Sequence, residues 1–241
     1  MTSPSSTSST PWLPQERPLL ARLVDSVFTV RCAGCDAPGA PLCHTCRLIL
    51  LDAAQMASGS ISGSPSGVIA AVELTGAVRR VIHGLKYRNR RAVVGHLAGL
   101  LLPRLIAAGS GPESGITAVT WAPTHRDRKI ERGYDQAELL AREVARRLGL
   151  PAVCLLDRVD TAGSQTGRSR VERQNQPAFR GRPSHHRRVL LIDDVVTTGS
   201  TLAAARGALR TAAVEHIVTA AVAATPLATQ PARARVIATA A

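Results

Sequence analysis

Aromatic residues are scarce in this chain. Trp, Tyr and Phe occur twice each and make up 2% of the 241 residues, whereas hydrophobic residues as a whole reach 45%. We therefore expect a core built mainly from Ala, Val, Leu and Ile, in one or two domains. The same scarcity argues against a surface that binds nucleic acid mainly by stacking bases on aromatic side chains.

Long apolar runs are also lacking. No stretch reaches the ~18 consecutive apolar residues that a membrane-crossing helix needs, and the longest candidate, Leu97–Leu105, is interrupted by Pro103 and Arg104. Residues 1–18 are rich in Ser, Thr and Pro, without the basic start and apolar centre of a signal peptide. We therefore expect a cytoplasmic protein without membrane insertion, and a disordered tail over residues 1–18.

Acidic residues are few relative to basic ones. The 17 Asp and Glu stand against 30 Lys and Arg, which gives a formal net charge of +13 at pH 7. This excess suits a polyanionic ligand such as pyrophosphate or nucleic acid, although evenly spread basic residues would form no site. The densest group contains no acid and consists of Arg79, Arg80, Lys86, Arg88, Arg90 and Arg91. It is either a solvated helix face or an anion-binding rim.

Only five cysteines are present, and four of them form two C-x-x-C pairs. Cys32 and Cys35 precede a seven-residue spacer, and Cys43 and Cys46 follow it. Two such pairs can converge on one tetrahedral Zn²⁺, and disulfides are uncommon inside cells. We predict a helix and a structural zinc module over residues 19–57. Four free thiols or a disulfide pair are the alternatives.

The stretch Val189–Thr201, VLLIDDVVTTGST, is the most informative part of the chain. Its apolar start predicts a strand that is covered on both faces and ends at Ile192. Asp193 and Asp194 follow, and at the carboxyl end of a parallel strand they can face a ligand crevice. The small and hydroxyl residues at 197–201 precede a predicted helix, where backbone N–H groups bind phosphate. The pattern predicts a sugar-phosphate site; the alternative is an ordinary strand, turn and helix.

Strands and helices alternate through the remaining chain. Strands are predicted at 67–72, 116–122, 153–156 and 217–224, and helices at 75–85, 92–107, 137–148 and 202–210. This alternation favours an α/β fold with a parallel sheet flanked by helices. A Ser- and Gly-rich linker at 58–67 separates the cysteine module from a domain at 68–241. The polar segment 161–187 is predicted to be an active-site flap.

The aspartate-containing motif resembles the binding motif for phosphoribosyl pyrophosphate (PRPP) in type I phosphoribosyltransferases. By this resemblance, Asp193 and Asp194 hold the ribose hydroxyls of PRPP, which binds with Mg²⁺. The PRPP-binding residues that it implies are Asp193, Asp194, Val195, Thr197, Thr198, Gly199, Ser200 and Thr201, the last five on the 5′-phosphate. Candidates for contact with the pyrophosphate leaving group are Arg126, Arg132, either Arg170 or Arg173 from the flap and, less favoured, Lys86.

The chain as a whole resembles the ComF family of competence proteins, over roughly residues 28–224. Besides the cysteine pairs and the aspartate motif, the matching pieces are Leu85-Lys86-Tyr87, Pro123, Arg132-Gly133-Tyr134-Asp135-Gln136, Gln165, Arg173, Asn175 and Phe179. The resemblance implies a type I phosphoribosyltransferase-like domain preceded by a zinc module with four cysteine ligands. It implies either a phosphoribosyltransferase or a non-catalytic accessory protein for DNA uptake or recombination that binds single-stranded DNA. Some members act with a helicase-like partner, and the acceptor substrate is not implied.

Overall fold

The computed structural model describes residues 30–57, 67–159 and 178–225. From Arg31 onward the described residues belong to one compact unit. The predicted tail, almost all of the linker, and much of the flap, with Arg170 and Arg173, lie outside the described residues. The domain boundaries drawn from the sequence therefore stay predictions.

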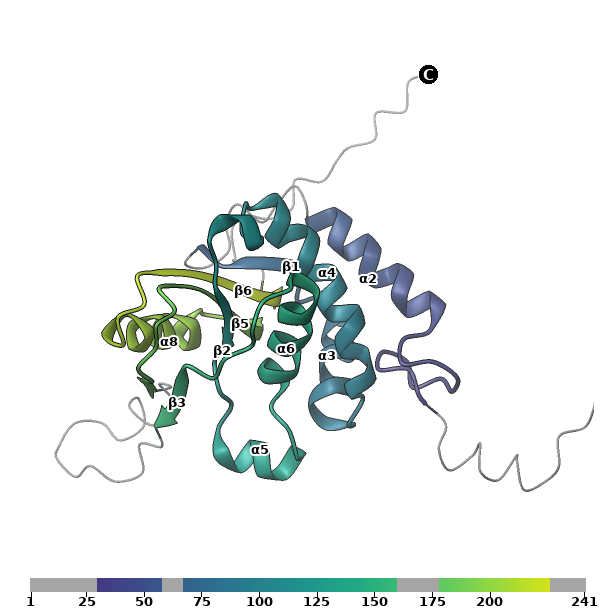
Figure 1. The fold of residues 1–241 in the computed structure, drawn as a ribbon. Helices are drawn as coiled ribbons and strands as arrows, with labels where there is room; N and C mark the ends of the chain where they lie inside the picture. The colour runs from purple at the N-terminus through teal and green to yellow at the C-terminus, as the bar shows by residue number, and fades with distance from the viewer. Residues whose placement is uncertain (1–29, 58–66, 160–177, 226–241) are drawn as a thin grey trace, which may run out of the picture. The chain divides into compact units, whose positions relative to one another are not determined.

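Four parallel strands of the described residues form the central sheet, in the order β1-β6-β5-β2 (Figure 1). They are β1 (Ile69–Glu73), β2 (Ala118–Trp121), β5 (Arg188–Val196) and β6 (His216–Ala224). β5 and β6 are the central pair and carry long apolar runs, as strands covered on both faces do. The predicted parallel sheet is confirmed, with strand ends shifted by a few residues.

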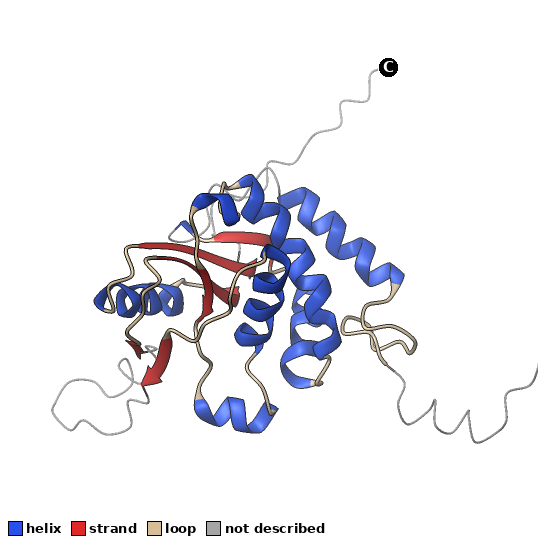
Figure 2. Ribbon diagram, viewed as in Figure 1, coloured by secondary structure: helices blue, strands red, loops and turns tan. Residues whose placement is uncertain are grey.

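Helices cover both faces of this sheet (Figure 2). On one face lie α2 (His44–Ala57), α3 (Gly76–Tyr87), α4 (Val94–Ala107) and α6 (Gln136–Leu148), and on the other lies α8 (Ser200–Thr211). Successive residues of β5 alternate between the two cores: Leu190 packs toward α4 and α6, and Leu191 toward α8. Because side chains alternate along a strand, neighbouring residues of β5 face opposite helix layers.

Helix α4 continues through Pro103. It follows a 3₁₀ turn at Arg91–Val93 and runs to Ala107; a second 3₁₀ turn spans Pro112–Ser114. Leu101 and Leu105 flank the proline and are fully buried in the core. Packing of this apolar face therefore outweighs the unfavourable helix propensity of proline.

Two short antiparallel strands, β3 (Leu156–Val159) and β4 (Ala178–Gly181), form a separate sheet. The strand predicted at 153–156 is wrong in position, because Ala152 makes only an isolated bridge to Val119 of β2 and regular pairing starts at residue 156. The predicted flap is also wrong over 178–181, where β4 packs on α8. Gly181 allows this contact, since a Cβ there would clash with the carbonyl of Ala208.

Candidate functional site

Strand β5 does not end at Ile192, as the sequence predicted, but continues to Val196. The reason is its long neighbour β6, which pairs with β5 up to Val196. On the other side β2 ends at Trp121, directly opposite Ile192. Asp193 and Asp194 therefore lie just beyond the carboxyl end of β2, in a part of β5 that has lost one of its two strand neighbours.

Lys86, at the end of α3, contacts the second aspartate. Its Nζ lies 2.7 Å from Oδ2 of Asp194, and the two side chains are 23% and 11% exposed. From the sequence, Lys86 is the less favoured of the candidate cations. Its position in the Leu85-Lys86-Tyr87 piece was the available signal. The structure thus adds a lysine to the aspartate pair.

Asp193 holds its proton more tightly than an ordinary carboxyl group. Burial and the Asp194 charge raise the pKa of Asp193 to about 8, against the opposing effects of the Asp194 backbone N–H and of Lys86. That N–H donates to Oδ1 of Asp193 at 2.8 Å. A cation or hydroxyl donor placed beside the pair would favour its ionised form. The pair is therefore suited to a ligand that brings such groups.

The loop after β5 leads directly into α8. Gly199 is the N-cap of α8, with a left-handed φ of 80°. Thr198 Oγ1 donates to Ser200 Oγ at 3.1 Å and lies 3.4 Å from the Ser200 backbone N. Because Gly199 has no side chain to cap the helix, an anion can satisfy the N–H groups of the first turn and meet the positive end of the helix dipole.

The residues at 132–136 hold the end of α3 that carries Lys86. The Tyr134 hydroxyl donates to the backbone carbonyl of Leu85. The guanidinium of Arg132 lies 4.8 Å from the centre of the Tyr87 ring and donates to Gln136 Oε1 at 2.9 Å. Leu85 and Tyr87 flank Lys86 in the sequence. Two segments that resemble ComF proteins, 85–87 and 132–136, therefore contact each other in the fold.

The segment after β2 is helix α5 (Arg126–Arg132). Asp135, which follows α5, connects the two sides of this segment. One of its carboxylate oxygens accepts the backbone N–H of Thr124, before α5, at 2.7 Å, and the other caps α6 by accepting from Ala137 and Glu138. Burial raises the pKa of Asp135, and these N–H bonds oppose the rise. With both ends fixed in this way, the basic stretch folds as a helical turn.

The two arginines predicted for the leaving group lie in different surroundings. Arg126 lines an open cavity of about 510 Å³, together with Lys129 and Glu138, whose charged groups lie 3.3 Å apart. Arg132 instead stacks on Tyr87, next to Lys86. Of these two arginines, the structure links Arg132 to the aspartate pair through a chain of contacts.

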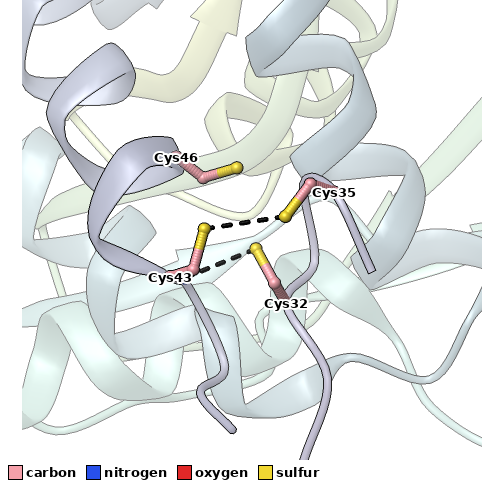
Figure 3. Close-up of side chains that lie close together, drawn as sticks. All are labelled: Cys32, Cys35, Cys43 and Cys46. Atoms are coloured by element: carbon pink, nitrogen blue, oxygen red, sulfur yellow. Dashed lines mark hydrogen bonds between the residues drawn. The ribbon is translucent and has the colours of Figure 1, made fainter. Parts of the chain in front are cut away.

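The four paired cysteines come together as one cluster (Figure 3). Their Sγ atoms all lie within 4.8 Å of one another, and those of Cys35 and Cys43 are 3.6 Å apart. Zn–S bonds of about 2.3 Å in a tetrahedron place sulfur atoms about 3.8 Å apart. The cluster can therefore hold a metal ion, and a set of four sulfur donors suits zinc.

Backbone groups prepare one cysteine for metal binding. The N–H groups of Gly34 and Cys43 donate to Sγ of Cys32 at 3.4 Å each. Burial raises the pKa of the Cys32 thiol, but backbone N–H bonds from Cys43, Cys35 and Gly34 outweigh it and bring the pKa to about 6. Burial instead raises the pKa of Cys46. The thiolate is the form that ligates metal.

The cysteine loop packs directly on α3. Gly84 makes this possible, because a Cβ there would clash with the backbone of Ala33. Asp36, in a left-handed conformation with φ of 63°, accepts from Arg90 at 2.7 Å. Leu42 joins the same hydrophobic core as the sheet. The loop that carries the cysteine cluster therefore packs on α3, the same helix that carries Lys86.

Comparison with known proteins places this arrangement in a family. Residues 135–239 match the family model of a phosphoribosyl transferase domain. Competence protein F of Haemophilus influenzae is 30% identical over 198 residues, which cover 77% of this chain and 86% of that protein. The chain belongs to the competence protein F (ComF) family. The family and the phosphoribosyltransferase-type domain predicted from the sequence are confirmed.

Other relatives carry the name DNA utilization protein YhgH. The Salmonella typhi protein is 30% identical over 149 residues, covering 56% of this chain and 62% of its own length. The Escherichia coli O157:H7 protein is 31% identical over 132 residues, covering 51% and 56%. Among solved structures, an adenine phosphoribosyltransferase matches at 15% identity and a TM-score of 0.36, over 59% of this chain and 84% of that one.

None of the helices in the described ranges is both long and apolar enough to cross a membrane.

Proposed function

We propose that the chain binds PRPP together with Mg²⁺ at the end of β5, and transfers or recognises its phosphoribosyl group. The observation that carries the proposal is the half-open end of β5, where Asp193 and Asp194 lie a few residues before Gly199, the N-cap of α8. Carboxylates accept hydrogen bonds from ribose hydroxyls, and residues 197–201, in the loop and the first turn of α8, offer N–H and hydroxyl donors to the 5′-phosphate. Val195 lies between these two groups of residues.

The chemistry of transfer needs positioning and cations more than a protein base. In a type I transfer the ribose C1 passes through an oxocarbenium-like state, a nitrogen nucleophile attacks directly, and pyrophosphate leaves. Mg²⁺, when bound, neutralises pyrophosphate charge, and carboxylate oxygens are ligands that it accepts. Lys86 pairs with Asp194 and Arg132 stacks on the neighbouring Tyr87, so both are candidates for contact with the pyrophosphate. Arg126 and, from the flap, Arg173 complete the proposed set.

Isothermal calorimetry with PRPP and Mg²⁺ tests the proposal. Hydrogen bonds to a charged group contribute roughly 1.5–3 kcal/mol. Asp193→Asn and Asp194→Asn should therefore each weaken binding by about 10- to 150-fold. Asp52→Asn, which changes an exposed aspartate on α2, is the matched control and should bind as wild type does. Ribose 5-phosphate should compete and free sulfate should compete poorly.

The proposal fails if wild type shows no PRPP binding up to millimolar concentration. It also fails if both asparagine variants bind PRPP as tightly as wild type.

For the cysteine cluster we propose one structural Zn²⁺ held by Cys32, Cys35, Cys43 and Cys46. The support is the convergence of four sulfur donors and the N–H bonds to Cys32. Such an ion would tie the two halves of the loop together where few apolar side chains are available.

A second candidate function is the binding of single-stranded DNA, as an accessory protein in DNA uptake or recombination. One observation favours it: Tyr87 is 58% exposed among the basic residues of 79–91, with Arg132 on its ring and the His83 ring 4.5 Å away. An exposed aromatic ring beside cations can stack on a base. The relatives are named a competence protein and a DNA utilization protein, which points to the same setting. The family resemblance adds a helicase-like competence protein as a proposed partner. A mobility-shift titration with a single-stranded oligonucleotide in rising salt tests this candidate.

A further inference from the structure

Helices α2 and α4 and the end of α6 enclose an open cavity of about 450 Å³. None of its lining residues belongs to the proposed PRPP site. Its floor is apolar and consists of Leu42, Leu50 and Leu100, which are all buried. Its rim includes Arg47 and Leu51 from α2, spaced one helical turn apart, and Arg147 from α6. We refer to this cavity as the α2–α4 groove.

The shape of the groove is fixed by contacts around it. Gly95 and Gly99 lie one turn apart on α4, and a Cβ at these positions would approach the Arg147 guanidinium to 3.3 Å and 3.1 Å. Arg147 therefore lies flat against α4, where it donates to the Gly95 carbonyl at 2.7 Å. Arg104 donates to the Ala54 carbonyl and holds α2 to α4 farther along. A preformed groove loses little conformational entropy when it binds.

The charge around the groove is positive. Arg47 and Arg147 both act on His96, whose pKa is lowered by burial and by the two guanidinium charges. Arg147 pairs with Glu143 at 2.7 Å, whereas no acidic side chain of the described residues lines the groove itself. A ligand that carries a carboxylate would relieve this excess of positive charge.

An apolar surface continues outside the groove along α2. Leu48 and Leu51 lie about one turn apart and are 51% and 42% exposed. Exposed apolar side chains that adjoin a groove are typical of a surface that contacts another protein. Because this apolar surface extends beyond the cavity, its occupant must be longer than a small molecule.

We propose that the α2–α4 groove binds a helical segment of a partner protein that presents apolar side chains to the leucines and a carboxylate to Arg47 and Arg147. Helices with apolar residues on one face bind apolar grooves in this way. Two copies of this chain fit poorly groove to groove, since Arg47 and Arg147 of each would bring like charges together. A nucleic acid strand would leave the leucine floor without apolar contacts.

A displayed library of random 12-residue peptides, selected on the full-length protein, tests the proposal. We expect enriched peptides to carry apolar residues at helical spacing together with Asp or Glu. In fluorescence anisotropy, Leu51→Glu and Arg47→Glu should each weaken such a peptide roughly tenfold or more. A peptide with Lys in place of its acidic residue should bind Arg47→Glu better than wild type.

Matched controls separate the groove from its surroundings. Met56→Glu alters an exposed apolar residue of the same helix that does not line the groove, and Arg210→Glu alters an exposed arginine on α8. Both variants should bind the peptide as wild type does. The proposal is overturned if no acidic, apolar peptide is enriched, or if the groove variants leave binding unchanged. Preferential binding of an oligonucleotide at the groove, or dimerisation abolished by Arg47→Glu, would also overturn it.

Discussion

At the scale of single residues, the contact between Lys86 and Asp194 balances a carboxylate that is almost completely buried. Lys86→Met keeps the aliphatic stem but removes the charge, which leaves Asp194 without its cation. We expect the free energy of unfolding to fall by about 1–3 kcal/mol. In urea denaturation, the double variant with Asp194→Asn should lose less than the sum of the two single variants. Additive losses would show that the two side chains do not interact.

Asp193 gives the protein a pH dependence with a defined sign. Its pKa is about 8 in the folded chain and about 4 in an unfolded one. The folded state therefore holds the proton more tightly, and this contribution to stability is complete below pH 4 and lost as the pH rises to about 8. The change approaches at most about 1.4 kcal/mol per pH unit.

Asp193→Asn removes that proton equilibrium. Relative to wild type, the variant should become progressively more stable between pH 5 and pH 8, because all other titrating groups are shared. Urea denaturation of both proteins at several pH values measures the difference. A difference that is flat with pH would contradict the raised pKa.

At the scale of elements, the contact between α3 and the cysteine loop depends on one missing Cβ. Gly84→Ala would place a methyl group against the backbone of Ala33, and we expect a loss of about 1–3 kcal/mol. Gly207→Ala, in the middle of α8 and with no atom within 4 Å of the new Cβ, is the matched control. It should stabilise by up to about 1 kcal/mol. Thermal unfolding tests whether Gly84→Ala lowers the stability while Gly207→Ala raises it. A loss of stability in both variants would show that the contact with Ala33 is not what makes Gly84 necessary.

The cysteine cluster makes the loop before α2 depend on metal. Purified without added metal, the protein should contain close to one zinc per chain by elemental analysis. Apparent binding free energies for zinc-finger peptides are about 10–16 kcal/mol, so a strong chelator should unfold this loop and lower the thermal stability. Cys46→Ser should lose the zinc, whereas Cys154→Ser, which changes the cysteine outside the cluster, should keep it. A metal-free protein with a folded cysteine loop would rule out zinc as its support.

At the scale of the whole molecule, the charge of +13 gives any polyanion some affinity for the surface. A specific basic site should stand out from this background. Replacing Arg79, Arg80 and Arg88 with Ala should weaken binding of single-stranded DNA and reduce the slope of log K against log salt by about 2. Arg90 and Arg91 are left intact, because the first pairs with Asp36 and the second stacks on Tyr134.

The control for that variant removes the same charge elsewhere. Arg146, Arg187 and Arg210 are exposed and lie on or beside other elements. An equal change in salt slope for both triple variants would mean that DNA binds through overall charge alone.

Patterns that are local in the sequence predicted much of this structure. The apolar run of β5, the periodic helix α6 and the paired cysteines were all recognisable, because each depends on neighbouring residues. What the sequence could not supply depends on distant partners. The end of β5 is decided by β6, and the importance of Lys86 depends on how α3 packs. Strand β4 pairs with β3 and packs on α8, where Gly181 allows the close approach.

The close fit of Gly84 against Ala33 also bears on how far the two parts of this chain could be exchanged. A cysteine loop transplanted onto another phosphoribosyltransferase-type domain would not pack unless the recipient helix had a glycine at the matching position. It would also lack Arg90, which pairs with Asp36 of the loop. A chimera would therefore have to carry the cysteine loop and α3 together, because the loop packs only on a helix with a matching surface.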